Sequence, residues 1–489
     1  MGDVRVRFAP SPTGLLHVGG VRTALFNYLF AKQSSGTFIL RLEDTDRERF
    51  VPEGVEQIVN GLDWLDLKPS EGFWINEGKQ SGIEYVQSER HKQGNYQKWA
   101  DQLVKDGLAY YSQISTEDYA KLKEVDRSKP FVYKKSMETP GDATESRPIR
   151  LDTEAAKAKF KLAKIDWHDE VRGEFSNEVD LIEDFILIKS DGYPTYNFAN
   201  IIDDYDMHIS HVIRGDEFIA STAKHVLLYK ILGWEAPKFV HLPVINGTDG
   251  KKLSKRSGDT DVLDYKKKGY LPEALLNFLA LLGWNPGAGE TQEIFNMDEL
   301  AKRFSLEHVQ KSPAVFDPNR LDWMNGAYIR ALEPGALLNK IVEFLGGSAL
   351  AKLIEKDQVD SLAAVQLIQE RMKRLDETED LMDFFYTDPK PKQLDFGKVD
   401  TADTKKYLQA TIDAIQANPK AFDDFGKDLE DLMRETVLPK SGAEKAGPLF
   451  MTIRIAITGK TATPGLFETM VALGQDTVIR RLEAAIKTL

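Results

Sequence analysis

The sequence predicts an α/β fold built on a parallel sheet, followed by a C-terminal part that is all helix. Residues 4 to 42 follow a strand–helix–strand order, which is the unit of a parallel sheet. Beyond about Asn325 the helix formers Ala, Leu, Glu, Lys and Gln are abundant, and strand-like alternation is hard to find. With 489 residues, the chain has room for about three domains at roughly 150 residues each.

The first strand and helix follow from the spacing of apolar residues. Val4, Val6 and Phe8 alternate with polar residues, which is the period of a half-buried strand. A loop punctuated by Pro and Gly comes next. From Val21 to Leu29 apolar residues recur at three- and four-residue steps, so they form one face of a helix.

The turn between this strand and helix is a candidate anion site. Phe38 to Leu42 is predicted to be the second strand of the unit, and an acidic turn follows it. His17, Gly19 and Gly20 lie at the start of the helix, where backbone N–H groups and the helix dipole favour an anion such as a nucleotide phosphate. The motifs G-x-G-x-x-G and G-x-x-x-x-G-K-[ST] are absent from this turn, so neither explains it.

The middle of the chain continues the pattern around an insertion. Pro52 to Leu65 and Thr222 to Leu232 each place apolar residues on one helix face. Asp184 to Lys189 and Phe239 to Leu242 are short apolar runs, typical of buried strands. Ser112 to Glu183 is dominated by charged and small polar residues with several Pro breaks, which predicts an insertion between two halves of one domain.

Composition excludes several classes of protein. The chain has no cysteine, which rules out disulfides and thiolate metal sites. No apolar run reaches the ~18 residues of a membrane span, and the N-terminus lacks an apolar signal region, so we expect a cytoplasmic protein with no membrane partner. The net charge of −13 argues against indiscriminate nucleic-acid binding, although a locally basic face can still hold RNA.

Five strings carry a resemblance to a known family. P-S-P-T-G-L-L-H-V-G-G, at Pro10 to Gly20, resembles the "HIGH" signature of class I aminoacyl-tRNA synthetases in its glutamyl form, and R-L-E-D-T-D-R, at Arg41 to Arg47, resembles the family's next block. Y-P-T-Y-N-F-A-N at Tyr193 to Asn200 and H-V-I-R-G-D-E at His211 to Glu217 are similar to the same family. L-S-K-R at Leu253 to Arg256 resembles the second class I signature, "KMSKS". A lone histidine or a basic loop is usually structural, but two signatures in the correct order would rarely arise by chance.

The resemblance is to bacterial-type glutamyl-tRNA synthetases and implies their architecture. That fold is a Rossmann-type parallel sheet with an inserted acceptor-end domain, followed by an all-α anticodon-binding domain. The implied domains are residues 1–111, the first half of the catalytic domain; 112–183, the acceptor-end binding insertion; 184–250, the second half; 251–324, the KMSKS-type loop and stem-contact region; and 325–489, the helical anticodon-binding domain.

The resemblance also implies the site residues. His17 and Lys255 would be the catalytic groups. ATP would contact His17, Gly19, Gly20, Lys252, Leu253, Ser254, Lys255 and Arg256. Glutamate would contact Arg7, Ser11, Glu43, Tyr196, Asn200 and Arg214. Glutamate has two carboxylates and one ammonium, which suits two arginines and one carboxylate in its pocket.

The implied reaction is the activation of glutamate with ATP and its transfer to tRNA(Glu). ATP is a substrate and would bind together with Mg²⁺. Members of the family are usually monomers, so the resemblance implies a monomer. We expect no zinc, because Ser112 and Ile114 stand where zinc-binding members carry their first Cys pair.

Three alternatives remain. A non-discriminating enzyme would also charge tRNA(Gln), and one sequence does not separate that form. A short relative that modifies a tRNA base lacks the helical domain, so residues 325–489 argue against it. A catalytically dead tRNA-binding module is disfavoured by the presence of His17, Lys255, Arg7, Glu43 and Arg214.

Overall fold

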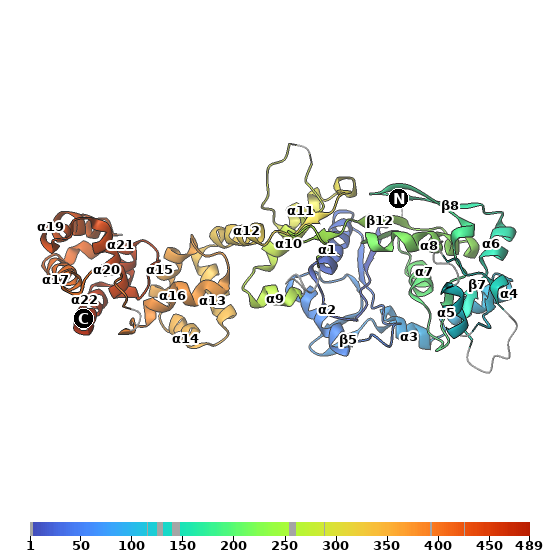
Figure 1. The fold of residues 1–489 in the computed structure, drawn as a ribbon, viewed down its shortest axis with the longest axis horizontal. Helices are drawn as coiled ribbons and strands as arrows, with labels where there is room; N and C mark the ends of the chain where they lie inside the picture. Colours follow the sequence, from blue (N-terminus) through green and yellow to red (C-terminus); the bar gives the residue numbers. More distant parts are fainter. Residues whose placement is uncertain are drawn as a thin grey trace. The chain divides into compact units, whose positions relative to one another are not determined.

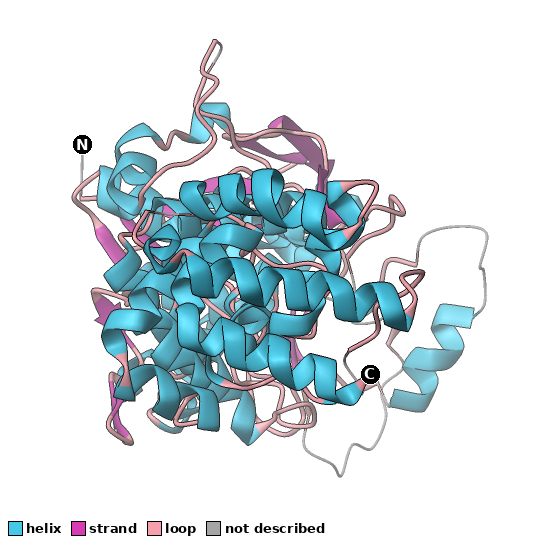
Figure 2. Ribbon diagram, turned by 90° about the vertical axis from the view of Figure 1, so that its left-hand side faces the viewer, coloured by secondary structure: helices cyan, strands magenta, loops and turns pink. Residues whose placement is uncertain are grey.

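The structure is a computed structural model that describes residues 3–114, 116–124, 131–138, 147–253, 261–287, 289–391, 394–424 and 426–489. The chain forms two compact units. The first contains Met1–Asp264 and Leu275–Asp317, and the second contains Tyr265–Ala274 and Pro318–Leu489. Figure 1 labels the helices and strands along the chain, and Figure 2 shows that helices dominate.

The first unit contains the predicted strand–helix–strand. Strands β1 and β2 pair in parallel, with Arg5 opposite Thr37, and helix α1 connects them. Strand β3 continues the sheet, also in parallel. The strands are β1 (Arg5–Phe8), β2 (Thr37–Leu40), β3 (Glu71–Gly72), β4 (Trp74–Asn76), β5 (Lys79–Ser81), β6 (Ala109–Tyr111), β7 (Ile149–Leu151), β8 (Lys164–Asp169), β9 (Gly173–Glu178), β10 (Ile186–Ile188), β11 (His211–Gly215), β12 (Lys238–Leu242), β13 (Ile245–Asn246) and β14 (Ala314–Val315).

A second parallel pair lies beside the first. Strands β11 and β12 are parallel, and the backbone N–H of Ser210 donates to the carbonyl of Arg5 at 2.9 Å, which joins the start of β11 to β1. Strand β12 in turn meets β8, and β8 forms an antiparallel hairpin with β9. Part of the predicted insertion therefore extends the sheet of β11 and β12, while β7 pairs with β6 and β10.

Helices cover these strands and bury their apolar side chains. The buried faces of α4, α7 and α8 join β7, β8 and β12 in one large apolar cluster. The helices are α1 (Val18–Gln33), α2 (Pro52–Trp64), α3 (Gln87–Lys92), α4 (Gln97–Lys105), α5 (Thr116–Glu124), α6 (Thr153–Phe160), α7 (Tyr196–Asp206), α8 (Ile219–Leu232), α9 (Val262–Lys267), α10 (Pro272–Ala280) and α11 (Met297–Arg303).

The described part of the second unit contains helices and no strand, as its composition predicts. Its apolar residues form two clusters, one mainly from α12 to α16 and one mainly from α17 to α22. In Figure 1 these helices run from yellow to red. They are α12 (Pro318–Ala331), α13 (Pro334–Leu345), α14 (Ala349–Lys356), α15 (Gln358–Gln369), α16 (Thr378–Tyr386), α17 (Thr401–Ala417), α18 (Lys427–Leu432), α19 (Leu438–Ser441), α20 (Ala446–Thr458), α21 (Leu466–Leu473) and α22 (Gln475–Thr488).

Gly72 lies where strand β3 meets β2 and admits no side chain. Its φ is +120°, and a Cβ atom there would lie 2.3 Å from the carbonyl oxygen of Leu40. We predict that Gly72→Ala lowers the free energy of unfolding by more than ~2 kcal/mol, because strain in φ and a backbone clash act together. Gly78→Ala is the matched control, since its φ is +75° and no atom lies within 4 Å of the added Cβ. Equal losses in denaturant unfolding of the two variants would contradict this.

Candidate functional site

The start of helix α1 is organised by a histidine. His17 is the N-cap, and its Nδ1 accepts a hydrogen bond from the N–H of Gly20 at 3.2 Å. Because Nδ1 is the acceptor, neutral His17 carries its proton on Nε2. A Cβ atom on Gly19 would lie 3.1 Å from Nδ1, so glycine at this position leaves the ring undisturbed. The other N–H groups of the first turn have no partner within the helix.

A buried network of charges lies at the ends of β1 and β2. Arg41 is 0% exposed and donates to Asp204 Oδ1 at 2.7 Å and to Glu43 Oε1 at 3.0 Å. Arg7 donates from Nε and Nη2 to the same Asp204 carboxylate, at 2.9 and 3.3 Å. Asn200 donates to Glu43 Oε1 at 2.9 Å. Burial opposes the charge of Arg41, but Asp204 and Glu43 outweigh it and raise the pKa of the guanidinium.

The expectation that β1 is half-buried is wrong at Arg7. The side chain of Arg7 is only 3% exposed, although it alternates with Val6 and Phe8 along the strand. The reason is its ion pair with Asp204 of α7, which lets a polar side chain enter the interior. Within the described residues, Nη1 of Arg7 has no hydrogen-bond partner, so one edge of the guanidinium remains available.

Arg214 at the end of β11 is buried among neutral groups. It is 5% exposed and donates to His241 Nε2 (3.1 Å), the hydroxyl of Tyr196 (3.1 Å), His225 Nδ1 (3.2 Å) and Thr222 Oγ1 (3.0 Å). No carboxylate of the described residues lies within 4.0 Å of its guanidinium. A buried cation without an anionic partner is costly, so this side chain is suited to an anionic ligand.

Both histidines on Arg214 are uncharged at neutral pH. Burial and the neighbouring charge of Arg214 hold the pKa of His225 well below its ordinary value. The pKa of His241 is also lowered, chiefly by burial, even though Asp169 opposes the shift. His241 Nδ1 lies 2.6 Å from Asp169 Oδ2, and His225 Nε2 lies 3.0 Å from Asn197 Oδ1. The two neutral imidazole rings therefore bind the guanidinium of Arg214 without neutralising its positive charge.

The structure brings together most, but not all, of the residues expected at the glutamate site. Arg7, Glu43 and Asn200 belong to one hydrogen-bonded network, and Tyr196 and Arg214 are bonded to each other. The side chain of Glu43 receives both of its hydrogen bonds on Oε1, so Oε2 has no partner within the described part of the chain. Ser11 is exposed, and its side chain joins neither group by a hydrogen bond among the described residues.

Two of the residues expected on ATP after β13 are described, and three are not. Lys252 is exposed, and its backbone forms an antiparallel β-bridge with Asn246. The N–H of Leu253 donates to the carbonyl of Ile245 at 2.9 Å. Of the basic segment, Lys251 and Lys252 are described, and both are exposed. Ser254, Lys255 and Arg256 lie outside the described residues.

Sequence reasoning missed the residues that hold this site together. Arg41 and Asp204 stood in or beside the quoted motifs, yet their pairing joins segments 163 residues apart and has no local signal. His225, His241 and Asp169 were not singled out. A signal existed for His241, since a histidine within the apolar run Phe239 to Leu242 must be buried and hydrogen-bonded.

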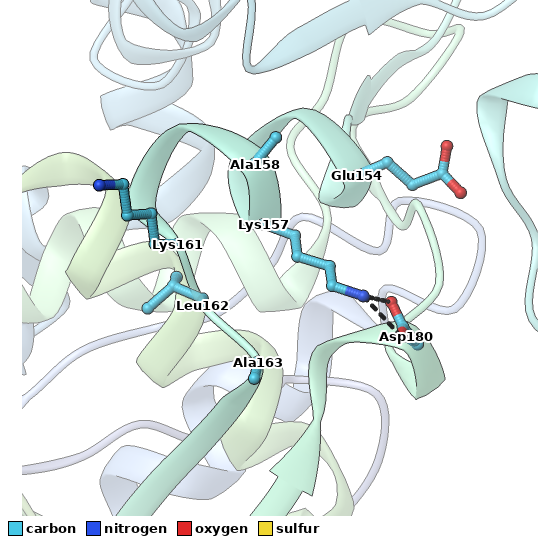
Figure 3. Close-up of a pocket in the computed structure, with 7 residues that line it drawn as sticks. All are labelled: Glu154, Lys157, Ala158, Lys161, Leu162, Ala163 and Asp180. Carbon is cyan, nitrogen blue, oxygen red and sulfur yellow. Dashed lines mark hydrogen bonds and ion pairs between the residues drawn. The ribbon is translucent and has the colours of Figure 1, made fainter.

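A hollow in the surface of the first unit lies elsewhere. It has a volume of about 550 Å³ and is lined by Glu154, Lys157, Ala158, Lys161, Leu162, Ala163 and Asp180. Figure 3 shows Lys157 turned toward Asp180, with which it pairs. The hollow is shallow and contains none of the expected site residues, so the geometry around Arg214 is the better guide to function.

Neither a metal cluster nor a membrane-spanning helix is found in the described part of the chain. No group of three or more His, Asp or Glu side chains there could hold a metal ion. Ser112 donates to the carboxylate of Glu138 at 2.5 Å, and the N–H of Gln113 donates to it at 2.8 Å. None of the described helices has the length and apolar character needed to cross a membrane.

The neutral histidines predict a pH dependence. His225 has a lowered pKa in the folded chain, so below its ordinary value of 6.5 the unfolded chain binds more protons. The free energy of unfolding should therefore fall as the pH drops from 7.5 to 5.5, by up to about 1.4 kcal/mol per pH unit for each such histidine. His225→Gln should reduce that slope in urea unfolding followed by tryptophan fluorescence. Identical slopes for both proteins would contradict the assignment.

Comparison with known proteins identifies the family of the chain. Residues 3–323 match the family model described as tRNA synthetases class I (E and Q), catalytic domain, and residues 336–486 match an anticodon binding domain. A glutamate–tRNA ligase of Elusimicrobium minutum is 40% identical, covering 99% of each chain, and one of Finegoldia magna is 38% identical, covering 99% of this chain and 100% of the relative.

Solved structures agree with the sequence matches. The crystal structure of a glutamate tRNA ligase from Elizabethkingia meningosepticum, in complex with its amino acid, superposes with a TM-score of 0.82 at 32% identity over 100% of both chains. The glutamate-tRNA synthetase of Elizabethkingia anophelis gives 0.80 at 32% identity, over 99% of this chain and 100% of that one. The chain therefore belongs to the glutamate–tRNA ligase family of class I tRNA synthetases.

Proposed function

We propose that this chain is a glutamate–tRNA ligase that charges tRNA(Glu). In the first step the α-carboxylate of L-glutamate attacks the α-phosphorus of ATP, which gives glutamyl-adenylate and releases pyrophosphate. In the second step a hydroxyl of the terminal ribose of the tRNA attacks the activated carbonyl and releases AMP. The observation that carries the proposal is the buried guanidinium of Arg214, which lacks a carboxylate partner among the described residues.

Glutamate supplies the charges that the pocket lacks. One carboxylate would compensate the charge of Arg214, replacing one of its neutral hydrogen-bond partners, and the other would meet the free edge of Arg7, while the ammonium would meet Glu43 Oε2. Tyr196, Asn200 and Ser11 would complete the hydrogen bonds. Glutamine would leave the charge of Arg214 buried and uncompensated, so the pocket should discriminate strongly against it.

ATP would lie at the start of helix α1. His17 and the first turn of the helix would contact phosphate oxygens, and Gly19 and Gly20 would allow close approach. Positive charge would reach the same phosphates from Lys252, Lys255 and Arg256, and ATP would also contact Leu253 and Ser254. We assign catalysis to Lys255 together with His17. ATP would arrive with Mg²⁺, which needs few protein ligands. Such a site works by positioning and electrostatic stabilisation, without a protein nucleophile.

The second unit would select the tRNA. Similarity of residues 336–486 to an anticodon binding domain supports a role in reading the anticodon. The segment 112–183 would hold the acceptor end near the adenylate, within the five domains that the resemblance implies. We assign the protein to the cytoplasm, because its product is consumed there in protein synthesis. We expect a monomer, as the resemblance implies.

Arg214→Ala should lower kcat/KM for glutamate by about 10²–10³-fold, since it leaves a substrate carboxylate buried without its partner. Arg214→Lys should recover only part of this loss, because an ammonium lacks the planar fork. The measurement is ATP–pyrophosphate exchange with tRNA(Glu) present, at varied glutamate and varied ATP.

Arg303→Ala is the matched control, because Arg303 in α11 pairs with Glu290 at the surface and belongs to neither part of the proposed site. Its kinetics should equal those of the unmodified protein. A folded Arg214→Ala variant with an unchanged KM for glutamate would remove Arg214 from the site.

The overall activity is tested by transfer of labelled glutamate, with ATP and Mg²⁺, onto separately transcribed tRNA(Glu) and tRNA(Gln). We expect charging of tRNA(Glu) alone. Charging of both would identify the non-discriminating form, whose host must convert the second product in an amidation step. Charging of neither, by folded protein, would refute the proposed function and favour a tRNA-binding module.

A further inference from the structure

We propose that Asp169 and His241 are positioning residues that set the direction of the Arg214 guanidinium, and through it the preference for an anionic amino-acid side chain. The inference rests on the proposed function, because it assigns Arg214 to the glutamate pocket. Asp169 comes from strand β8, His241 from β12 and Arg214 from β11, and these three strands are neighbours in one sheet.

The hydrogen bonds in this group can run in one direction only. An arginine only donates, so the 3.1 Å contact from Arg214 Nε obliges His241 Nε2 to accept. The proton of the neutral ring is then on Nδ1, and it is donated to Asp169 Oδ2 at 2.6 Å. Thr222 fits the same direction, since its hydroxyl accepts from Arg214 and has two acceptors in reach, the carbonyl of Phe218 at 3.1 Å and His241 Nε2 at 3.3 Å.

Asp169 is itself held rigidly. It is 0% exposed, and its Oδ1 accepts from the backbone N–H groups of Val171 at 3.1 Å and Arg172 at 2.8 Å. Its other oxygen is therefore left for His241. Burial favours the protonated acid, but the hydrogen bonds from His241 and these amides outweigh it and lower the pKa of Asp169. The carboxylate is charged and fixed in direction.

This arrangement orients a cation without neutralising it. Arg7 shows the other possibility, because Asp204 bonds it directly and balances its charge. At Arg214 a neutral imidazole stands between the cation and the carboxylate of Asp169. The guanidinium thus keeps its charge for the ligand while its Nε edge is fixed by the ring. Nη1 and Nη2 are oriented by the remaining contacts, which are to Tyr196, His225, Thr222 and the carbonyl of Phe218.

Asp169→Asn is the sharpest test, because it changes one atom and reverses the hydrogen bonds. The single oxygen of the substituted amide is required by two backbone N–H groups, so its NH₂ group faces His241 Nδ1. His241 Nδ1 must then accept a hydrogen bond from this NH₂ group, so the proton of the neutral ring moves to Nε2. The Nε2–H then faces the Nε–H of Arg214, and two donors cannot form a hydrogen bond. An aspartate-to-asparagine change beside a histidine is known to act in this way, by stabilising the wrong tautomer.

We expect Asp169→Asn to raise the KM for glutamate about 10–100-fold in ATP–pyrophosphate exchange with tRNA(Glu) present, the scale of losing one hydrogen bond to a charged group. The KM for ATP should stay within about twofold. His241→Gln should retain most of the affinity for glutamate, because an amide can accept from Arg214 and donate to Asp169. Asp166→Asn is the control on the same strand, where the side chain is exposed.

The tautomer provides a readout that a purely structural role would not move. In the unmodified protein labelled with ¹⁵N-histidine, the resonance absent from His241→Gln should show a proton on Nδ1 only, and in Asp169→Asn it should show a proton on Nε2. A proton on Nε2 in the unmodified protein would overturn the proposal, whether or not any variant folds.

An unchanged KM for glutamate in folded Asp169→Asn would also overturn it, as would equal rises in both KM values. Failure of the proposed function is distinguishable, because the unmodified protein would then show no glutamate-dependent exchange at all.

Discussion

A buried positive charge needs a negative partner, and this constraint organises the first unit. Arg41 is completely buried and contacts Asp204 and Glu43, and removal of either partner would leave a charge in the interior at a cost of roughly 3–5 kcal/mol. Because Asp204 also binds Arg7, one carboxylate of helix α7 joins strands β1 and β2. The ends of the sheet and the helix above it are thus placed by a few hydrogen bonds.

Arg214 departs from this rule at the position where the proposed function needs it to. Its neighbours accept hydrogen bonds but bring no charge, so an anionic ligand would complete the local electrostatics. The family to which the chain belongs is named for an amino acid with an anionic side chain, and the proposed pocket would supply a physical reason for such a choice. Selectivity then follows from desolvation, because a neutral analogue of the same size would leave the cation unpaired.

Local patterns were sufficient to predict most elements. The alternation around Val6, the helix face from Val21 to Leu29 and the helical composition beyond Asn325 each correspond to an observed element. Alternation also exists in β8, where Ile165, Trp167 and Asp169 are buried and their neighbours exposed, but the polar composition around it led to an insertion being predicted there. The hairpin of β8 and β9 extends the sheet through β12.

The side-chain network of the site could be predicted only in part. Motif residues such as Arg7, Glu43, Asn200 and Arg214 were identified. The structure joins the first three through Arg41 and Asp204, by hydrogen bonds that span up to 197 residues of sequence. Arg214 belongs to a separate group of hydrogen bonds. No period or spacing encodes such pairs, because they depend on which strands become neighbours. The tautomer of His241 is even harder to predict from the sequence, since it follows from the direction of two hydrogen bonds.

The pairing of Arg41 with Asp204 has a consequence for synthesis of the chain. The two residues are 163 positions apart, so Arg41 leaves the ribosome long before helix α7, which carries the carboxylate that neutralises its charge. At the usual rate of about 5–20 residues per second, the interval is roughly 10–30 s. During that time Arg41 cannot be buried with its full set of partners. The N-terminal strands of the nascent chain therefore stay open to chaperones and proteases until α7 has been made.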